Sequence, residues 1–218
     1  MTIPVLTIDG PSGAGKGTIS RLIAKKLGWH YLDSGSIYRS LAIAVLQRAV
    51  DLADEPQVIK VAQNLALEFE CNDELLVKLD GADITPQLGL ESTGKVASIV
   101  AAMPEVRQVL LQKQKDFRQA PGLVADGRDM GTVVFPDAQY KAFLTASAAE
   151  RAGRRYKQLK EKGIDANLSL ITNEIEERDR RDRERETAPL AMASDALYID
   201  SSDMCIDDVV EEVLSLIR

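Results

Sequence analysis

The residue types at positions 8–18 of this 218-residue chain are suited to holding phosphate. Glycines allow a tight turn in which successive backbone N–H groups converge on an anion, and a following helix adds the partial positive charge of its N-terminus. Lys16 stands where its ammonium would bridge the β- and γ-phosphates. The segment therefore predicts a binding loop for a nucleoside triphosphate. We expect ATP contacts from Gly10, Pro11, Ser12, Gly13, Ala14, Gly15, Lys16, Gly17 and Thr18.

The order of residues after the lysine narrows the class of protein. Gly17 stands where many phosphate loops carry Ser or Thr, so Thr18 is the expected hydroxyl ligand of Mg²⁺. This spacing resembles the loops of small-molecule and nucleotide kinases more than those of GTPases. Asp33, at the end of the next predicted strand, is expected to hold the metal through water. A glycine-rich turn without ligand would use the same residues, but its strand and helix flanks favour phosphate.

The elements that position this loop alternate between strand and helix. Apolar runs predict strands at 5–8, 29–33, 122–126, 140–144 and 196–200, and helical spacing predicts helices at 19–27, 36–49, 56–67, 92–118, 149–162, 168–186 and 206–217. The long helix at 92–118 is interrupted at Met103-Pro104, where proline suits the first turn of a new helix. The expected fold is α/β, with a parallel sheet of about five strands flanked by helices.

A hairpin interrupts this alternation. Residues 66–71 and 75–81 read as antiparallel strands around a turn at 72–74. We therefore expect a core domain of 1–65 and 93–218, with 66–92 as a small inserted lobe. The loop at 154–168, which begins at Arg154 and Arg155 and lies between two charged helices, is the expected lid. Adenine is expected against Arg154 and the Ser201-Ser202 turn.

Composition excludes several classes of partner. The formal net charge of −7 argues against a nucleic-acid backbone or an anionic membrane as the main partner. A run of about 18 apolar residues, which a membrane span would need, does not occur, and the first residues lack the pattern of a signal peptide. We expect a cytoplasmic monomer. Cys71 and Cys205 lack metal-ligand spacing, and His30 lacks the partners of a general base, so we assign them structural roles.

Arginines recur at four places where a second anionic molecule could bind. Arg39 follows Asp33, Arg107 follows Ser98, and Arg128-Asp129 follows a predicted strand. Ligands of open α/β sheets bind at such carboxyl ends of strands. The fourth segment is a predicted helix with one charged face, because the i, i+3, i+4, i+7 rule brings together Arg178, Arg181, Asp182 and Arg185. A solvated helix with internal ion pairs would explain these residues too, but a neighbouring phosphate loop favours a phosphoryl-binding stripe.

Three segments resemble the bacterial cytidylate kinases: DSGSIYR at 33–39, DGRDMGTVVFPD at 126–137, and the Arg-Asp-x-x-Asp-x-x-Arg helix with Ala-Pro-Leu at 178–190. The likeness runs from the phosphate loop to the last helix. It implies a P-loop NTPase fold with a nucleoside monophosphate-binding insert and a helical lid. By that resemblance, the base would be bound by Ser98, Arg107 and Asp129, the sugar by Arg178 and Asp182, and the acceptor phosphate by Ser34, Arg39, Arg128 and Arg185.

The activity implied by this resemblance is transfer of the γ-phosphoryl group of ATP, with Mg²⁺, to CMP and dCMP, giving ADP and CDP or dCDP in pyrimidine nucleotide metabolism. Lys16, Arg128, Arg178 and Arg185 would stabilise the charge of the transferring group. Asp129 would accept from the cytosine amine and disfavour uracil. Asp182 would pair with Arg178 and Arg185 while it accepts from a ribose hydroxyl.

Two alternatives stay open at this stage. A kinase of the same fold could act on another nucleotide or on a small metabolite such as shikimate or dephospho-coenzyme A. Such an enzyme would not need the 126–131 and 178–185 sets together. A regulatory nucleotide switch is disfavoured, because the chain has no guanine-reading Asn-Lys-x-Asp motif.

Overall fold

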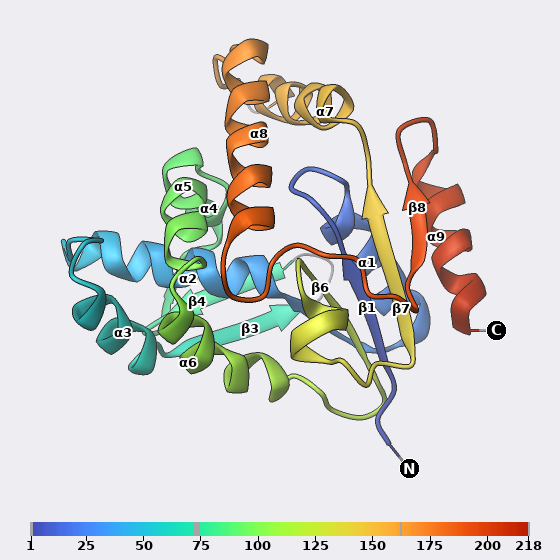
Figure 1. Ribbon diagram of the computed structural model, residues 1–218, viewed down its shortest axis with the longest axis horizontal. Helices are drawn as coiled ribbons and strands as arrows, with labels where there is room; N and C mark the ends of the chain where they lie inside the picture. The colour runs from blue at the N-terminus through green and yellow to red at the C-terminus, as the bar shows by residue number, and fades with distance from the viewer. Residues whose placement is uncertain (1, 72–74, 162, 218) are drawn as a thin grey trace.

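A five-stranded parallel sheet forms the centre of the molecule. The computed structural model describes residues 2–71, 75–161 and 163–217. The strands lie in the order β2-β6-β1-β7-β8. Figure 1 labels β6, β1, β7 and β8 of this sheet. Their bounds are β1 Val5–Asp9, β2 His30–Asp33, β6 Leu123–Gly127, β7 Tyr140–Thr145 and β8 Leu197–Asp200. The predicted α/β class and the number of parallel strands are confirmed.

Helices cover both faces of this sheet, as its apolar strands require. In β1 alternate side chains point to opposite faces, so Val5 joins one buried cluster while Leu6 and Ile8 join the other. The helices are α1 Lys16–Leu27, α2 Ser34–Gln47, α3 Glu55–Gln63, α4 Thr85–Leu88, α5 Glu91–Val100, α6 Pro104–Lys115, α7 Ala148–Glu161, α8 Leu168–Glu184 and α9 Ile206–Leu214. The cluster around Val5 includes α2, α5 and α6, and the other includes α1 and α9.

One predicted helix ends too late, and one predicted break between helices is confirmed. The helix predicted at 56–67 ends at Gln63, because Leu67 begins strand β3 (Leu67–Cys71). The break predicted at Met103-Pro104 is confirmed, since α5 ends at Val100 and Pro104 begins α6. Proline suits this first position because its missing N–H would have no helical partner there.

The predicted hairpin is present as part of a second sheet. Strand β3 pairs antiparallel with β4 (Leu75–Leu79), which pairs with the short β5 (Ala82–Asp83). The turn predicted at 72–74 lies outside the described residues. Buried Val77 and Leu79 belong to the same apolar cluster as α2 and α5, so this sheet is packed onto the helical layer. The division into a core and an inserted lobe at 66–92 stays a prediction.

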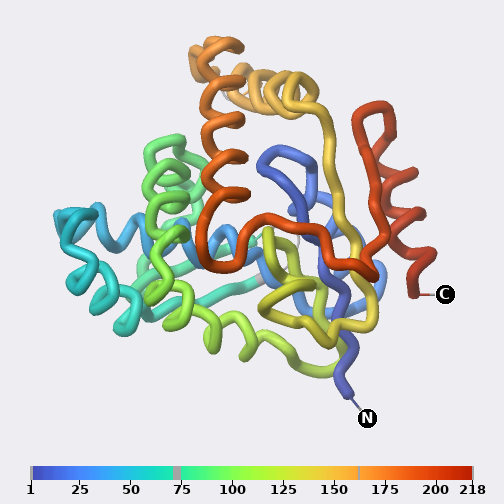
Figure 2. Tube along the Cα trace, viewed as in Figure 1, coloured from blue at the N-terminus to red at the C-terminus, as the bar shows by residue number. Residues whose placement is uncertain are grey.

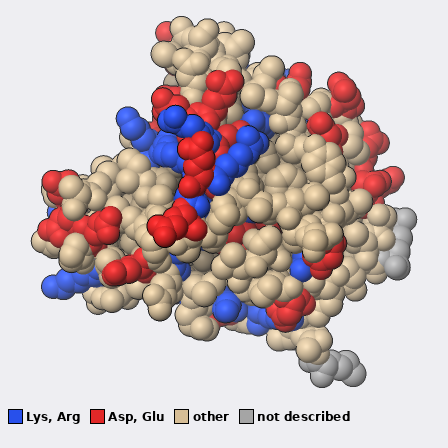
Figure 3. Space-filling model, in the orientation of Figure 1, with Lys and Arg blue, Asp and Glu red and all other residues tan. Residues whose placement is uncertain are grey.

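Helices α7 and α8 project from the body as a pair (Figures 1 and 2). Ala152, Leu159, Ile171 and Ile175 give this pair an apolar cluster of its own. The predicted lid at 154–168 is therefore mostly helical, because its first part lies in α7. Basic and acidic side chains interleave along α8 in Figure 3. Within the described residues, no helix has both the length and the apolar character that a membrane span requires.

Candidate active site

The glycine loop joins β1 to α1 with the geometry expected of a phosphate cradle. Helix α1 begins at Lys16, and Gly15 before it has a left-handed backbone with φ 93°. The Lys16 ammonium is buried and donates to the Pro11 carbonyl oxygen at 2.8 Å. Burial, with the nearby charge of Arg128, lowers the pKa of Lys16 to about 7. The loop therefore holds its lysine folded back onto Pro11, in surroundings where an anionic ligand would favour the charged ammonium.

Two carboxylates lie at neighbouring strand ends beside this loop. Asp33 and Asp126 are paired across β2 and β6. Asp33 caps helix α2 by accepting from the Ser36 N–H at 3.0 Å. Asp126 is buried and accepts from the Tyr31 hydroxyl at 2.7 Å, and burial together with the charge of Asp33 raises its pKa to about 7. Sequence reasoning selected Asp33 but not Asp126, although Asp33 is the last residue of β2 and Asp126 is the last but one of β6.

Two adjoining cavities receive the predicted ligand-binding residues. A cavity of about 870 Å³ is lined by residues 12–18, Asp33, Arg39, Asp126, Arg154 and Ser201, and a pocket of about 40 Å³ by Ser34, Ser98, Arg107, Asp129, Asp182 and Arg185. Gly35, Arg128 and Arg178 line both. The predicted site residues are thus brought together, apart from Gly10 and Pro11, which line neither cavity. Another cavity of about 920 Å³, among Trp29, Phe69 and Phe117, contains none of the predicted acceptor residues.

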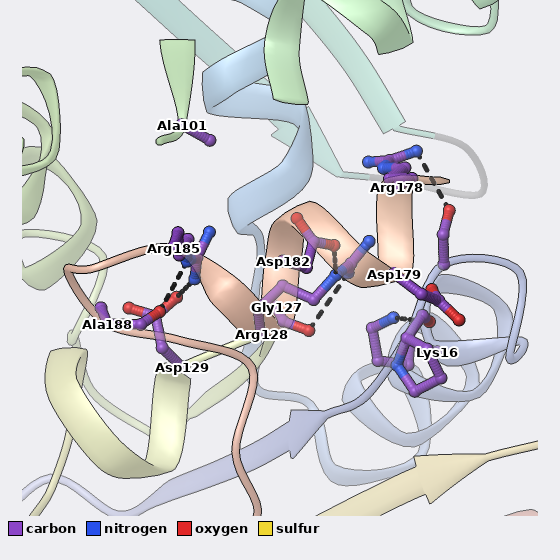
Figure 4. A network of polar contacts seen from close by, with 12 residues as sticks. Lys16, Ala101, Gly127, Arg128, Asp129, Arg178, Asp179, Asp182, Arg185 and Ala188 are labelled. Atoms are coloured by element: carbon purple, nitrogen blue, oxygen red, sulfur yellow. Dashed lines mark hydrogen bonds and ion pairs between the residues drawn. The ribbon is translucent and has the colours of Figure 1, made fainter. Parts of the chain in front are cut away.

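The smaller pocket is built around the carboxylate of Asp129. Its Oδ2 accepts from Arg107. Its Oδ1 accepts at 3.1 Å from Arg185, which lies beside it in Figure 4. All three side chains are nearly inaccessible, with exposed fractions of 4–7%. The Arg107 guanidinium also lies 5.5 Å from the centre of the Tyr38 ring. Beside this network, the Ser98 hydroxyl is buried without a hydrogen-bond partner among the described residues, so it has a free polar group to offer a ligand.

The predicted partners of Asp182 are wrong. Asp182 accepts from the Arg128 Nε at 2.7 Å, as Figure 4 shows, while Arg178 reaches the Ser12 hydroxyl at 3.0 Å. Arg185 follows the end of α8 in an extended conformation and turns toward Asp129. Arg185 lies beyond the end of α8 at Glu184, so helical spacing no longer places it beside Asp182, and Arg178, which is within the helix, donates to Ser12 instead.

Burial and neighbouring charges both shift the pKa values of Asp182, Arg128 and Arg178. Burial raises the pKa of the Asp182 carboxyl, but the charges of Arg128 and Arg178 outweigh it and the pKa is lowered. Burial lowers the pKa of Arg128, but the ion pair with Asp182 outweighs burial, so the pKa of Arg128 is raised. The pKa of Arg178 is lowered to about 9 by burial and by the charge of Arg128. An anion between Arg128 and Arg178 would relieve their repulsion.

Arg151 and Asp179 are functional candidates that sequence reasoning missed. Arg151, in α7, donates to the Ser12 carbonyl oxygen at 3.0 Å and to Asp179 of α8 at 2.7 Å. Its Cβ would lie only 3.2 Å from a Cβ added at Gly13, so α7 begins directly against the glycine loop. One guanidinium thus links both helices of the projecting pair to the phosphate cradle. In the sequence, Asp179 is one of several acidic residues of a charged helix, and nothing marks it as buried.

The remaining predicted residues contact the chain itself. Ser34 donates to the buried Gln114 at 2.7 Å, and Arg39 donates to the Leu88 carbonyl oxygen. Arg154 donates to the Ser201 carbonyl oxygen at 2.6 Å. Arg155 crosses the cleft to the Gly89 carbonyl oxygen at 2.9 Å and to Glu91. The helix pair is thus joined to the segment that precedes α5.

Comparison with known proteins gives consistent matches. The profile of the family described as cytidylate kinase matches residues 6–218. A cytidylate kinase of Methylococcus capsulatus is 58% identical, covering 100% of this chain and 98% of that protein, and one of Aeromonas salmonicida is 56% identical, covering 97% and 93%. Among solved structures, shikimate kinase of Acinetobacter baumannii in complex with shikimate aligns with a TM-score of 0.46 at 16% identity, covering 99% of this chain and 93% of that one. Nothing about substrate follows from a likeness of that size.

Proposed function

The chain belongs to the cytidylate kinase family. From this membership we infer that it is an ATP-dependent CMP kinase, and we propose that the larger cavity binds ATP while the pocket around Asp129 binds the acceptor nucleotide. Family membership favours CMP over the other nucleotides, metabolites and regulatory roles that the sequence left open. We extend the proposal to dCMP as a second acceptor.

On the ATP side, residues 10–18 would enclose the triphosphate. The backbone N–H groups of the loop would bind phosphate oxygens, and Lys16 would exchange the Pro11 carbonyl oxygen for the β- and γ-phosphates. Arg154 and Ser201 line the same cavity beyond the loop and would border the adenine. The low pKa of Lys16 supports this assignment, because the ammonium lacks a full countercharge until an anion binds.

The donor set beside the loop fits Mg²⁺. Thr18, Asp33 and Asp126 supply hard oxygen donors, and this small ion commonly binds one or two carboxylates together with water and phosphate oxygens. We propose that Thr18 holds the metal directly and that Asp33 and Asp126 hold it through water. Bound there, the metal would neutralise charge on the phosphates. The raised pKa of the buried Asp126 supports this placement, because a cation would favour its ionised form.

On the acceptor side, the pocket offers complementary chemistry for cytosine and a phosphate. Asp129 would accept from the N4 amine, while Arg107 and Ser98 would donate to the acceptor atoms N3 and O2. Uracil carries a carbonyl oxygen where cytosine has the amine, so Asp129 would face it without a proton to share. Arg178 and Asp182 would bind the sugar. Ser34, Arg39, Arg128 and Arg185 would bind the phosphate.

Catalysis in this site would consist of positioning and charge stabilisation. The attacking atom is a phosphate oxygen, which is already anionic and needs no general base. Lys16, Arg128, Arg178 and Arg185 would stabilise the charge that spreads over the transferring phosphoryl oxygens. Closure of the α7–α8 pair would exclude water, the competing acceptor. We propose that the chain works as a cytoplasmic monomer without a nucleic-acid or membrane partner, in keeping with its net charge of −7.

One observation carries the proposal: a buried carboxylate, Asp129, is held by two arginines beside a phosphate loop. The test is a coupled ADP-release assay with CMP, dCMP, UMP, AMP and shikimate. CMP and dCMP are expected to give the fastest turnover. Asp129→Asn is expected to raise the KM for CMP about 100-fold, since buried guanidinium groups lose a charged partner, and to change the KM for ATP less than about twofold.

The matched control is Asp137→Asn, which removes a carboxylate that is 64% exposed and paired with Arg118 outside the cleft. It should leave both KM values unchanged. Absence of CMP-dependent ADP release in the wild type would refute the activity. Equal losses for ATP and CMP in Asp129→Asn would refute the placement of the acceptor.

A further inference from the structure

The carboxylate of Asp9 joins the phosphate loop to the acceptor motif. Asp9 ends β1 directly before Gly10, and its side chain is only 4% exposed. Its Oδ1 accepts from the Met130 N–H at 2.8 Å and its Oδ2 from the Gly131 N–H at 2.7 Å. These bonds cross 121 and 122 positions of sequence. A single side chain therefore fixes the backbone that follows Arg128-Asp129 relative to the loop.

The N–H groups of Met130 and Gly131 begin a short helical turn, and the side chain of its N-cap residue, Asp129, makes no capping hydrogen bond to it. Residues Met130–Val134 form a π-helical turn, and Asp129 occupies the N-cap position. Aspartate at that position ordinarily accepts hydrogen bonds from the first free N–H groups. Here the Asp129 side chain makes no such bond, because its oxygens accept from Arg107 and Arg185 instead. The N–H groups that Asp129 leaves free are bound by Asp9.

We propose that Asp9 is a positioning residue for base selection: by capping the turn in place of Asp129, it keeps the Asp129 carboxylate turned into the acceptor pocket. The inference rests on the proposed function of that pocket. Without Asp9, the N–H groups of Met130 and Gly131 would be buried without an acceptor, and Asp129, at the N-cap position of the same turn, has a carboxylate that could turn to satisfy them. Turning toward them would remove Asp129 from Arg107, Arg185 and the cytosine amine.

The surroundings of Asp9 make its charged form costly. Gly131 permits the close approach, since a Cβ at this position would lie 3.4 Å from Asp9 Oδ2 and 2.8 Å from the Thr7 hydroxyl oxygen. Burial, despite the two N–H donors, raises the pKa of Asp9 to about 6, and the charge of Asp129 adds to the rise. The charged form is therefore unfavourable in this position, and a residue that served only packing would have no need of the charge.

The experiment compares Asp9→Asn and Asp9→Ser with the control Thr7→Val. Thr7 lies two residues earlier on the same face of β1, is fully buried against Gly131, and has a hydroxyl without a partner among the described residues. The readouts are KM for CMP, KM for ATP, and the ratio of kcat/KM between CMP and UMP. Thermal unfolding of each variant is recorded beside them.

Both Asp9 variants are expected to raise the KM for CMP and to lower the CMP-to-UMP ratio, each about tenfold, with the KM for ATP within about twofold of the wild type. Thr7→Val should leave both KM values and the CMP-to-UMP ratio unchanged. A purely structural role would lower the unfolding temperature or kcat while leaving the KM for CMP and the ratio unchanged, and that result overturns the proposal. Equal changes in Thr7→Val, which would indicate packing, overturn it as well.

Asp129→Asn, measured in the same series, separates this inference from the one it rests on. If Asp129→Asn leaves CMP selectivity unchanged, the assignment of the acceptor pocket fails and the role of Asp9 falls with it. If Asp129→Asn abolishes selectivity while both Asp9 variants retain it, the pocket stands and the positioning role of Asp9 alone is refuted. Two Asp9 variants are used so that poor folding of one leaves the other measurable.

Discussion

Removing either partner of the Arg151–Asp179 pair is expected to affect stability and nucleotide binding together. The pair is 2.7 Å apart with exposed fractions of 4% and 7%, so each substitution leaves a buried charge without its partner. Such a loss costs about 3–5 kcal/mol. For a chain of this size the unfolding temperature would fall by about 6–20 °C.

The perturbations are Arg151→Met, Asp179→Leu and the double variant. In the double variant no unpaired charge is left, so its cost should be lower than the sum of the single costs by about 2 kcal/mol or more. Arg151→Met should also raise the KM for ATP by about tenfold, because Ser12 loses the guanidinium that holds its carbonyl oxygen. Asp179→Leu, which leaves that bond possible, should raise the KM less.

Urea denaturation and initial rates at varied ATP give these values. Arg180→Met is the control, since Arg180 is the exposed neighbour of Asp179 on α8 and should cost less than about 0.5 kcal/mol. Strictly additive single costs, or an unchanged KM for ATP in Arg151→Met, would refute the idea that this pair links the helices to the phosphate loop.

Three other predictions concern the glycines, the buried carboxylate of Asp9 and the Arg155–Glu91 pair. Gly10→Ala should prevent folding, because its Cβ would lie 1.9 Å from a backbone carbonyl oxygen of β7. In the control Gly28→Ala, the added Cβ would have no atom within 4 Å, so the variant should lose only about 1–2 kcal/mol of stability through its left-handed backbone. Soluble yield and thermal unfolding compare the two variants. Asp9 has a folded pKa of about 6, above its ordinary 3.8, so its contribution to stability is present below about pH 4 and is lost as the pH rises to about 6. The difference in unfolding free energy between wild type and Asp9→Asn should therefore decline by up to about 3 kcal/mol from pH 4 to 7 in urea titrations, and a rising difference would contradict the assignment. Arg155→Gln and Glu91→Gln should each lower the free energy of unfolding by less than about 1 kcal/mol, because Glu91 is half exposed. Both variants should nevertheless bind CMP faster in stopped-flow measurements. Association rates equal to that of the wild type would show that the Arg155–Glu91 pair does not restrain opening of the α7–α8 pair.

Sequence patterns predicted the local parts of this structure well. The strands, the hairpin and the phosphate loop depend on alternation, helical spacing and glycine, which are properties of short segments. The grouping of Arg107, Asp129 and Arg185 was expected only through resemblance. Boundary errors arose where a tertiary contact ended an element early, as where Leu67 joins a sheet instead of extending α3.

The partners of charged residues were the least predictable feature. Asp182 was expected to pair along its own helix but pairs with Arg128, 54 residues away. Asp9 and Arg151 were overlooked because their contacts lie 121 and 139 positions distant, and no local spacing records such a contact. Asp126 is different: its position at a strand end beside Asp33 could have been inferred once β2 and β6 were placed side by side.

The route of the chain through the sheet bears on how such enzymes acquire new acceptors. After Asp33 the chain leaves the sheet, builds α2 to α6 and the small β-sheet, and re-enters at β6, the immediate neighbour of β2. The His30 N–H donates to the Gly122 carbonyl oxygen at this re-entry. Departure and return thus lie on neighbouring strands but at opposite ends of them, because β2 and β6 are parallel, so the excursion runs from the carboxyl edge of the sheet to its amino edge. Exchanging residues 34–122 between homologues would transplant Ser34, Arg39, Ser98 and Arg107 as one unit while the triphosphate cradle stays in its host.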